Sequence, residues 1–256
     1  MCGSRKWRWA AVLGLCTAWG VVTTAAGEFY ELRVIRVASA DKAAVLDAAL
    51  ESEGMQALAD AGMQVGVFRK QDGSSHDRYL LTVHADTYSI GESIVGPDSA
   101  DEAYGAAREY LGADPEDPVF TRQEVSLIKA VPTCPRLQDP EGMGSDERYF
   151  ELRTYESATE VKAARKIEMF EAGGEIELFG QVGLDLVFFG RAVAGDNLPQ
   201  LTYMLVYEDE DAKKAAWKTF VSSPEWERMK NLPRYKDTVS KIHSHFLVAL
   251  PYSHIR

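Results

Sequence analysis

The sequence predicts an α+β protein in which two tandem ferredoxin-like units, each β-α-β-β-α-β, pack sheet to sheet as one barrel within the chain. Three observations predict this fold. The segment Phe29-Tyr-Glu-Leu-Arg33 returns 120 residues later as Tyr149-Phe-Glu-Leu-Arg153. The same order of strand and helix patterns follows each copy. One such sheet carries helices on a single face, so its other apolar face needs the cover that a second copy supplies.

The elements of each unit follow from hydrophobic spacing. In the first unit we expect a helix at 40–60, strands at 62–68 and 79–84, a helix at 101–111 and a closing strand at 123–131. In the second unit the same order predicts a helix at 159–181, strands at 183–189 and 202–207, a helix at 211–221 and a strand at 242–250. Gly173 and Gly174 predict a kink or break in the 159–181 helix. Ser223 and Pro224 are typical of an N-cap and a first helical residue.

The N-terminus has the order of a secretory signal peptide, which predicts a targeting segment at residues 1–26. A basic start with Arg5, Lys6 and Arg8 is followed by an apolar stretch and then by small residues before Gly27. An uncleaved anchor and a mitochondrial presequence stay open as alternatives. We therefore expect an exported protein, periplasmic or secreted, without a membrane span after cleavage. The remaining chain divides into a first unit at 27–131, a linker rich in proline, glycine and acids at 132–147, and a second unit at 148–256.

Composition excludes several classes of protein. With 39 Asp+Glu against 28 Lys+Arg the formal net charge is −11, which argues against a protein that coats nucleic acid, because phosphate binding needs a basic face. Beyond residue 30 no apolar run is long enough for a polytopic membrane protein. Cys134 is the single cysteine after the predicted signal peptide, so the mature chain is expected to have no internal disulfide. Its acidic surroundings favour an inert linker thiol over a nucleophile.

Polar side chains alternate with apolar ones on the first strand of each unit. Glu31 and Arg33 share one face, and Glu151, Arg153 and Tyr155 share the matching face. We expect this face to line the space between the two sheets. One interpretation is a pair of structural ion pairs at the barrel rim. The other is a small polar pocket, in which Arg33 or Arg153 binds an anion and tyrosines form the walls.

Two histidines lie two residues apart on the predicted closing strand. His243 and His245 share one face, which could bind a metal if Glu124 or Glu151 completed the set. The alternative is polar lining or exposure to solvent. No HExxH, CxxC, GxSxG or Walker-type motif occurs, so no metal site, catalytic residue or cofactor is predicted, although haem or a metal stays open. The candidate pocket residues are Glu31, Arg33, His84, Glu151, Arg153, Tyr155, Tyr203, Tyr207, His243 and His245.

Several segments of the sequence together resemble the NIPSNAP family. They are the two opening-strand segments, Thr202-Tyr-Met-Leu-Val-Tyr207, Ala216-Trp217-Lys218, Pro224-Glu-Trp226 and Pro251-Tyr-Ser253. The second unit matches over nearly its whole length, and the first unit matches more loosely. The resemblance implies a dimeric α+β-barrel fold. It also implies relatives in a superfamily that includes haem-degrading monooxygenases, quinone-forming monooxygenases and chlorite dismutases. No catalytic set defines the family itself, so the resemblance supplies no catalytic residue.

Two functional hypotheses follow. In the first, the barrel of an exported, non-enzymatic protein holds a small organic or anionic ligand, or a protein partner; assembly of several copies stays open. Its support is the lack of any nucleophile–base–orienter set. In the second, a cofactor-poor or haem-dependent monooxygenase or isomerase-like enzyme uses the same pocket. His84, His243 or His245 would then serve as base or haem ligand, and Tyr203 or Arg153 would stabilise an anionic intermediate.

Overall fold

The computed structural model describes residues 27–60, 62–85, 116–138 and 148–256. The predicted signal peptide, the helix expected at 101–111 and most of the linker lie outside these residues. In the first unit the described elements are β1 (Phe29–Arg36), α1 (Ala40–Ala49), a π-helical turn (Leu50–Gly54), α2 (Met55–Asp60), β2 (Gln64–Lys70), β3 (Arg78–His84) and β4 (Arg122–Ala130). In the second unit they are β5 (Tyr149–Glu156), α5 (Glu160–Phe170), α6 (Glu175–Val182), β6 (Asp185–Ala194), β7 (Gln200–Tyr207), α7 (Glu210–Ser222), α8 (Pro224–Lys230), a 3₁₀ turn (Pro233–Tyr235) and β8 (Lys241–Ala249).

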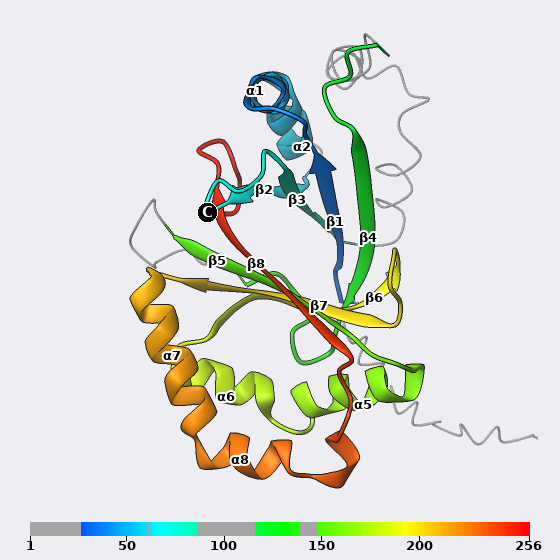
Figure 1. Cartoon of the computed structure of the whole chain (residues 1–256), viewed down its shortest axis with the longest axis vertical. Coiled ribbons are helices and arrows are strands. Elements are labelled where there is room, and N and C mark those ends of the chain that lie inside the picture. The colour runs from blue at the N-terminus through cyan, green and yellow to red at the C-terminus, as the bar shows by residue number, and fades with distance from the viewer. Residues whose placement is uncertain (1–26, 61, 86–115, 139–147) are drawn as a thin grey trace, which may run out of the picture.

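The strands form one closed antiparallel barrel in the order β1-β3-β2-β8-β5-β7-β6-β4. Each unit contributes four neighbouring strands, so the barrel closes within one chain and the predicted fold class is confirmed. Two seams join the units. At one seam Phe68–Lys70 pair with Leu247–Ala249, and at the other Leu127–Ala130 pair with Gly190–Ala194. Helices α5 to α8 cover the outer face of the second unit, while α1 and α2 lie at the opposite end of the molecule (Figure 1).

Glycine ends the first helix of the second unit. The predicted 159–181 helix is two helices, α5 and α6, and Gly173 and Gly174 separate them as expected. Gly174 has φ 91°, a left-handed conformation that glycine adopts without steric cost. A Cβ on Gly173 would lie 2.3 Å from the carbonyl oxygen of Met169, so a side chain does not fit there.

Ser223 caps α8 and accepts a hydrogen bond from the Trp226 amide, also as predicted. None of the helices in the described ranges is long and apolar enough to cross a membrane.

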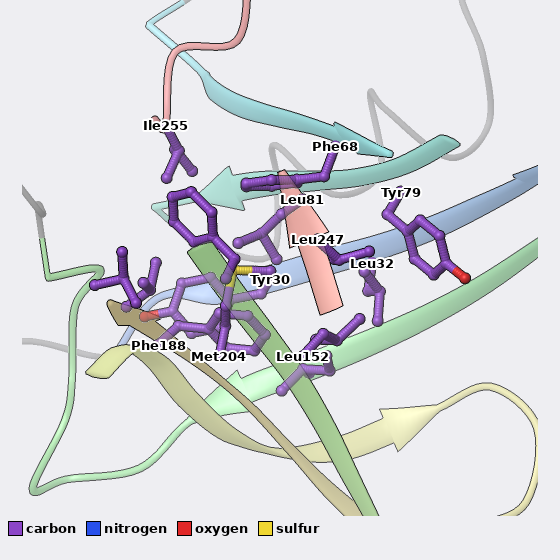
Figure 2. Close-up of a cluster of buried hydrophobic side chains, with 14 of the residues drawn as sticks. Tyr30, Leu32, Phe68, Tyr79, Leu81, Leu152, Phe188, Met204, Leu247 and Ile255 are labelled. Carbon is purple, nitrogen blue, oxygen red and sulfur yellow. The ribbon is translucent and has the colours of Figure 1, made fainter. Parts of the chain in front are cut away.

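The apolar core of the barrel lies between the two sheets (Figure 2). Side chains from both units meet there, so neither sheet face is exposed. The fully or almost fully buried members include Tyr30, Leu32, Phe68, Leu81, Phe150, Leu152, Phe188, Met204, Val206 and Leu247.

This core corrects the sequence-based assignment of strand faces. Glu31, Arg33, Glu151, Arg153 and Tyr155 were expected between the sheets, but the interior of β1 and β5 is formed by Tyr30, Leu32, Phe150 and Leu152. The polar side chains lie on the opposite face, which the helices cover in the second unit. On β3 and β7 the interior is formed by Leu81, Met204 and Val206, and on β4 and β8 by Ile128 and Leu247.

The physical reason is that a period of two separates the faces of a strand without saying which face is internal. The space between two sheets excludes water most completely, so it takes the large apolar groups, and a charge there would be costly. Under the helices, the guanidinium groups can reach partial exposure: the side chains of Arg33 and Arg153 are 27% and 17% exposed.

Candidate functional site

The candidate residues lie in three separate places. Glu151, Arg153, Tyr155, Tyr203 and Tyr207 form one cluster beneath the helices of the second unit. Glu31, Arg33 and His84 form a smaller group at the corresponding positions of the first unit. His243 and His245 are inside the barrel, at one end. The structure therefore brings together five of the ten predicted residues in one cluster and does not form a single pocket from all ten.

The carboxylate of Glu151 is the centre of the second-unit cluster, and it is 2% exposed. One oxygen accepts a hydrogen bond from Ser244 Oγ at 2.8 Å and an ion pair from Arg153. The other accepts from Tyr207 Oη at 3.0 Å and from the Trp217 indole at 3.1 Å. Four different donors therefore satisfy one buried carboxylate, as a buried charge requires.

Electrostatics keep this carboxylate ionised. Burial alone would raise the pKa of Glu151, but the Arg153 charge and the hydrogen bonds from Ser244, Arg153 and Trp217 outweigh burial and lower it. Burial opposes the charge of Arg153 too, yet its pKa is raised because Tyr203, Tyr155 and Glu151 favour the charged form. Both groups are charged at neutral pH, so Glu151 and Arg153 form a buried ion pair within the second unit.

The tyrosines extend the cluster toward the helices. Arg153 donates to Tyr155 Oη at 3.0 Å, and this hydroxyl lies 2.9 Å from Tyr203 Oη. Burial raises the pKa of both tyrosines. Beyond Tyr155, Lys166 and Glu175 form a second buried ion pair at 2.8 Å. Every group in the cluster has a partner within it, so this cluster stabilises the packing of helices on the sheet and leaves no open coordination for a ligand.

The first-unit group is a reduced version of the same arrangement. Arg33 donates to Glu31 at 3.0 Å through Nε and to Gln123 at 2.6 Å. In the strand register His84 takes the place that Tyr207 has in the second unit, because each lies opposite the first residue of β1 or β5. His84 is fully buried, and its Nε2 lies 3.5 Å from the second oxygen of Glu31.

The barrel mouth is the place where polar groups surround a cavity. We use this name for the pocket of about 230 Å³ where the C-terminal ends of β1 and β5 meet the N-terminal ends of β3, β4, β7 and β8. Its polar lining includes Arg36, Tyr79, Glu124, Thr202, His243 and His245. The loop between β6 and β7 adds Asp196 and Asn197. The pocket therefore draws side chains from both units and exists only because the units are joined.

Two groups at the mouth have no hydrogen-bond partner in the described part of the chain. Tyr79 is 1% exposed, and its hydroxyl is buried without a partner. This hydroxyl points away from the apolar cluster (Figure 2). The ring of His245 makes no hydrogen bond to a described residue and lies 5.5 Å from the Tyr79 ring, centre to centre. Burial and then the charges of Lys70, His243 and Arg36 lower the pKa of His245, so its imidazole is neutral at pH 7 with a nitrogen free to accept.

Several charged and polar residues around the mouth are paired with each other. Arg36 donates to Glu124 at 2.8 Å and to Asp77 at 2.8 Å, and these contacts raise its pKa, the Glu124 bonds most of all. His243 Nε2 lies 2.6 Å from the carboxylate of Glu156. The hydroxyls of Thr154 and Thr202 are 3.1 Å apart. Paired charges hold the rim of the pocket in place around the two unpaired groups.

Sequence reasoning missed three residues that matter to these sites. Trp217 was not among the candidate pocket residues, yet its indole donates to Glu151 and, at 2.9 Å, to Tyr207 Oη. Arg36 and Tyr79 were not proposed at all. Strand periodicity could have indicated Arg36, because it follows Leu32 and Val34 on one face of β1. Tyr79 gave no such signal, since its place opposite His245 depends on how the two units dock.

A haem group does not fit the barrel mouth. A pocket of about 230 Å³ is below the range of about 300–1,000 Å³ that is usual for larger ligands. A larger groove of about 870 Å³ lies between α5 and the β4–β6 seam, but no histidine or cysteine lines it. Among the described residues, no group of three or more His, Cys, Asp or Glu is arranged to hold a metal ion.

Comparison with known proteins agrees with this architecture. A candidate monooxygenase from Lactobacillus acidophilus is similar over 87% of this chain and 94% of its own, with a TM-score of 0.55 and 14% identity. A second candidate monooxygenase, from Fusobacterium nucleatum, has a TM-score of 0.55 at 10% identity over 88% of this chain and 93% of its own. At these identities the likeness shows the fold alone. No curated protein matches the chain.

The family signal lies in the second unit. The NIPSNAP family model matches residues 150–254. A NIPSNAP-like domain protein from Burkholderia xenovorans covers 43% of this chain and 90% of its own at 19% identity, with a TM-score of 0.39. The matched residues include the Glu151 cluster, Trp217 and both mouth histidines. The family model therefore identifies a NIPSNAP domain at residues 150–254, within the second unit.

Proposed function

We propose that this protein is an exported binding protein that takes up a small polar organic molecule in the barrel mouth. One observation carries the proposal: a pocket of about 230 Å³ is lined by the Tyr79 hydroxyl, which is buried without a hydrogen-bond partner in the described part of the chain, and by the half-buried imidazole of His245. Leaving a buried donor unsatisfied costs about 1–3 kcal/mol, which a ligand that bonds to it would recover. The rim is held by ion pairs, so the pocket is preorganised.

The Glu151 cluster is not part of this proposal. One of the two interpretations of the sequence had this arginine bind an anion, but Arg153 is engaged by Glu151 and Tyr155. Arg33 is engaged in the same way by Glu31 and Gln123. A ligand would have to displace these contacts, whereas at the mouth it would displace none from Tyr79 or His245.

Binding can be tested with three small probes of similar shape and different charge: propylammonium, 1-propanol and propionate. Calorimetry and saturation-transfer NMR on the full chain should detect at least one of them. Tyr79→Phe and His245→Phe keep the ring and remove the polar atoms, so each should weaken binding about 3- to 10-fold. His76→Phe, at an exposed position outside the pocket, is the matched control. If no probe binds, or if binding is the same in all variants, the proposal fails.

Export is tested separately. The proposal expects the mature protein in the exported fraction, with an N-terminal mass that starts at or close to Gly27. A chain that keeps Met1 and stays in the cytosolic fraction would contradict export without affecting the binding result.

A second candidate function is proton-transfer catalysis in the same pocket. The specific observation is His245, a neutral imidazole that lies against the Tyr79 ring and lines the pocket together with Arg36. The fold neighbours described as candidate monooxygenases are compatible with a chemical role. This role can be tested with 5-nitrobenzisoxazole, a substrate that reports on general-base catalysis. His245 would take the carbon-bound proton of this compound while its N–O bond breaks. Equal rates in wild type and His245→Phe would exclude this role.

A further inference from the structure

The strap, which is our name for residues 250–256 after β8, covers part of one edge of β2. On this edge β8 pairs with β2 only over Phe68–Lys70, so none of the described strands pairs with the earlier part of it. The strap turns at Leu250 and lies beside this earlier part (Figure 1). Because β8 begins at the barrel mouth, the strap lies at the opposite end of the barrel.

Four hydrogen bonds join the strap to two residues of β2. The Leu250 amide donates to the Val67 carbonyl at 2.9 Å, and the Val67 amide donates to Ser253 Oγ at 2.9 Å. The His254 amide donates to the Val65 carbonyl at 3.0 Å, and the Val65 amide donates to His254 Nδ1 at 3.2 Å. Val65 and Val67 are 1% and 0% exposed, so these backbone groups depend on the strap for their partners.

Side chains of the strap anchor it to the rest of the molecule. Ile255 is 3% exposed and belongs to the apolar cluster between the two sheets (Figure 2). The Ser253 hydroxyl donates to the Ile255 carbonyl at 2.7 Å, and the Tyr252 hydroxyl donates to Asp47 of α1 at 2.8 Å. The strap therefore connects the last strand of the second unit to the first unit.

His254 is the residue of the strap that titrates near pH 6. A backbone amide can only donate, so Nδ1 of His254 is unprotonated when it accepts from the Val65 amide. The ring is exposed, so a proton can reach it from solvent. Protonation makes Nδ1 a donor, and this hydrogen bond is then lost. The other three bonds use amides, carbonyls and a hydroxyl, none of which titrates between pH 5 and pH 7.

Charged groups around the strap do not oppose this reading of His254. Residues 63–68, which include its partner Val65, have no ionisable side chain. The charged residues of the strap and of the elements packed on it include Asp47, Glu51, Asp60, Arg69, Arg78, Arg148 and Arg256. None of these lowers or raises the pKa of His254, which burial lowers. The closed strap therefore binds a proton less tightly than an open one, whose imidazole has a pKa of about 6.5.

We propose that the strap is a pH-dependent cover of the β2 edge, and that protonation of His254 shifts it toward release. Release uncovers the backbone groups of Val65 and Val67 and withdraws Ile255 from the end of the barrel. The uncovered segment is then an unpaired sheet edge. This inference goes beyond the proposed binding function and does not depend on it, because the strap and the barrel mouth lie at opposite ends.

Hydrogen exchange of the Val65 and Val67 amides in the full chain measures how often the strap opens. In wild type, the protection factors of both amides should fall about fivefold from pH 7 to pH 5, as expected for the loss of one hydrogen bond. His254→Asn keeps an acceptor oxygen in place of Nδ1 and does not titrate, so its protection factors should be equal at the two pH values. His76→Asn, at an exposed position in the β2–β3 loop, is the matched control and should keep the wild-type fall.

Two further measurements separate release of the strap from other effects. The Tyr203 amide, in the middle of β7 between two paired strands, reports unfolding of the whole barrel. Ser253→Ala removes the acceptor of the Val67 amide without removing a titrating group, so it should lower protection by the same factor at both pH values. The proposal is overturned if Val65 and Val67 keep their protection at pH 5, if His254→Asn shows the wild-type fall, or if Tyr203 loses protection by the same factor.

Discussion

The guanidinium of Arg153 lies 4.8 Å from the centre of the Trp217 ring, and both side chains bond to the carboxylate of Glu151. Arg153 comes from β5 and Trp217 from α7, so this contact joins the sheet of the second unit to its covering helix. The Arg153 cation is attracted to the face of the Trp217 ring, and both side chains also share the Glu151 carboxylate as a hydrogen-bond acceptor. The relationship gives a buried polar cluster a structural role, and the first prediction follows from it.

Glu151→Gln should destabilise the fold by about 2–4 kcal/mol. The substitution removes a buried charge while the Arg153 cation stays, and an unpaired buried charge is costly; the partial exposure of Arg153 reduces the loss. Urea unfolding monitored by tryptophan fluorescence measures the change, because Trp217 is part of the cluster. Glu225→Gln, on the exposed face of α8, should stay within about 0.5 kcal/mol of wild type. A loss for Glu151→Gln as small as that of the control would show that the cluster contributes little.

Lys166 and Glu175 should behave as a coupled pair. Their side chains are 5% and 3% exposed, and burial raises the pKa of Glu175 despite the neighbouring Lys166 charge. Lys166→Met should cost about 3–5 kcal/mol because the remaining carboxyl is buried without its partner. Adding Glu175→Gln removes that carboxyl and should recover part of the loss, which a double-mutant cycle detects. Additive losses would contradict the coupling.

The free energy of unfolding should decrease as the pH is lowered from 7 to 5, and part of this decrease should depend on His245. Burial, followed by the charges of Lys70, His243 and Arg36, lowers the pKa of His245 in the folded state. The unfolded state therefore binds a proton first as the pH falls below about 6.5, and protonation then favours unfolding. Free energies of unfolding at the two pH values should differ less in His245→Phe than in wild type. The exposed His76 is the control position, and His76→Phe should keep the wild-type difference.

Cys134 should be unreactive in the native protein. Burial raises the pKa of its thiol to about 11, and its Sγ donates to the carbonyl of Arg136 at 3.8 Å. Alkylation by iodoacetamide at pH 8, followed for this residue by peptide mass mapping, should be at least about 100-fold slower in native buffer than in concentrated urea. Similar rates in both conditions would mean that the segment opens readily.

Much of the fold could be predicted because it depends on local patterns. The motif at Phe29 and Tyr149, followed each time by the same order of helix and strand signals, is enough to predict the ferredoxin-like units. The break at Gly173 and the cap at Ser223 depend on one or two residues and were also predicted. The helix at 40–60 was less accurate, since a π-helical turn divides it. No signal in the residues indicates that turn.

The candidate site could be predicted only in part. Adjacent positions on one strand, such as Glu151, Arg153 and Tyr155, are readily grouped, and the structure does place them together. The face they occupy was predicted wrongly, because alternation is symmetric with respect to inside and outside. The contact between the rings of Tyr79 and His245 could not be predicted, since these residues come from different units and meet across the barrel.

The sequence by itself determined the order of the described strands and of most of the described helices, the closure of two units into one barrel and the residue types available for chemistry. The tertiary structure decided which of these residues lie in a cavity. It buried the Glu–Arg pairs under helices, where each charge has its partners, and left Tyr79 and His245 without partners at the mouth. The physical reason is that a buried polar group finds its hydrogen-bond partners on strands that are distant in the sequence. Hydrophobic periodicity specifies that strands form, but only the docking of two sheets decides which donors and acceptors meet.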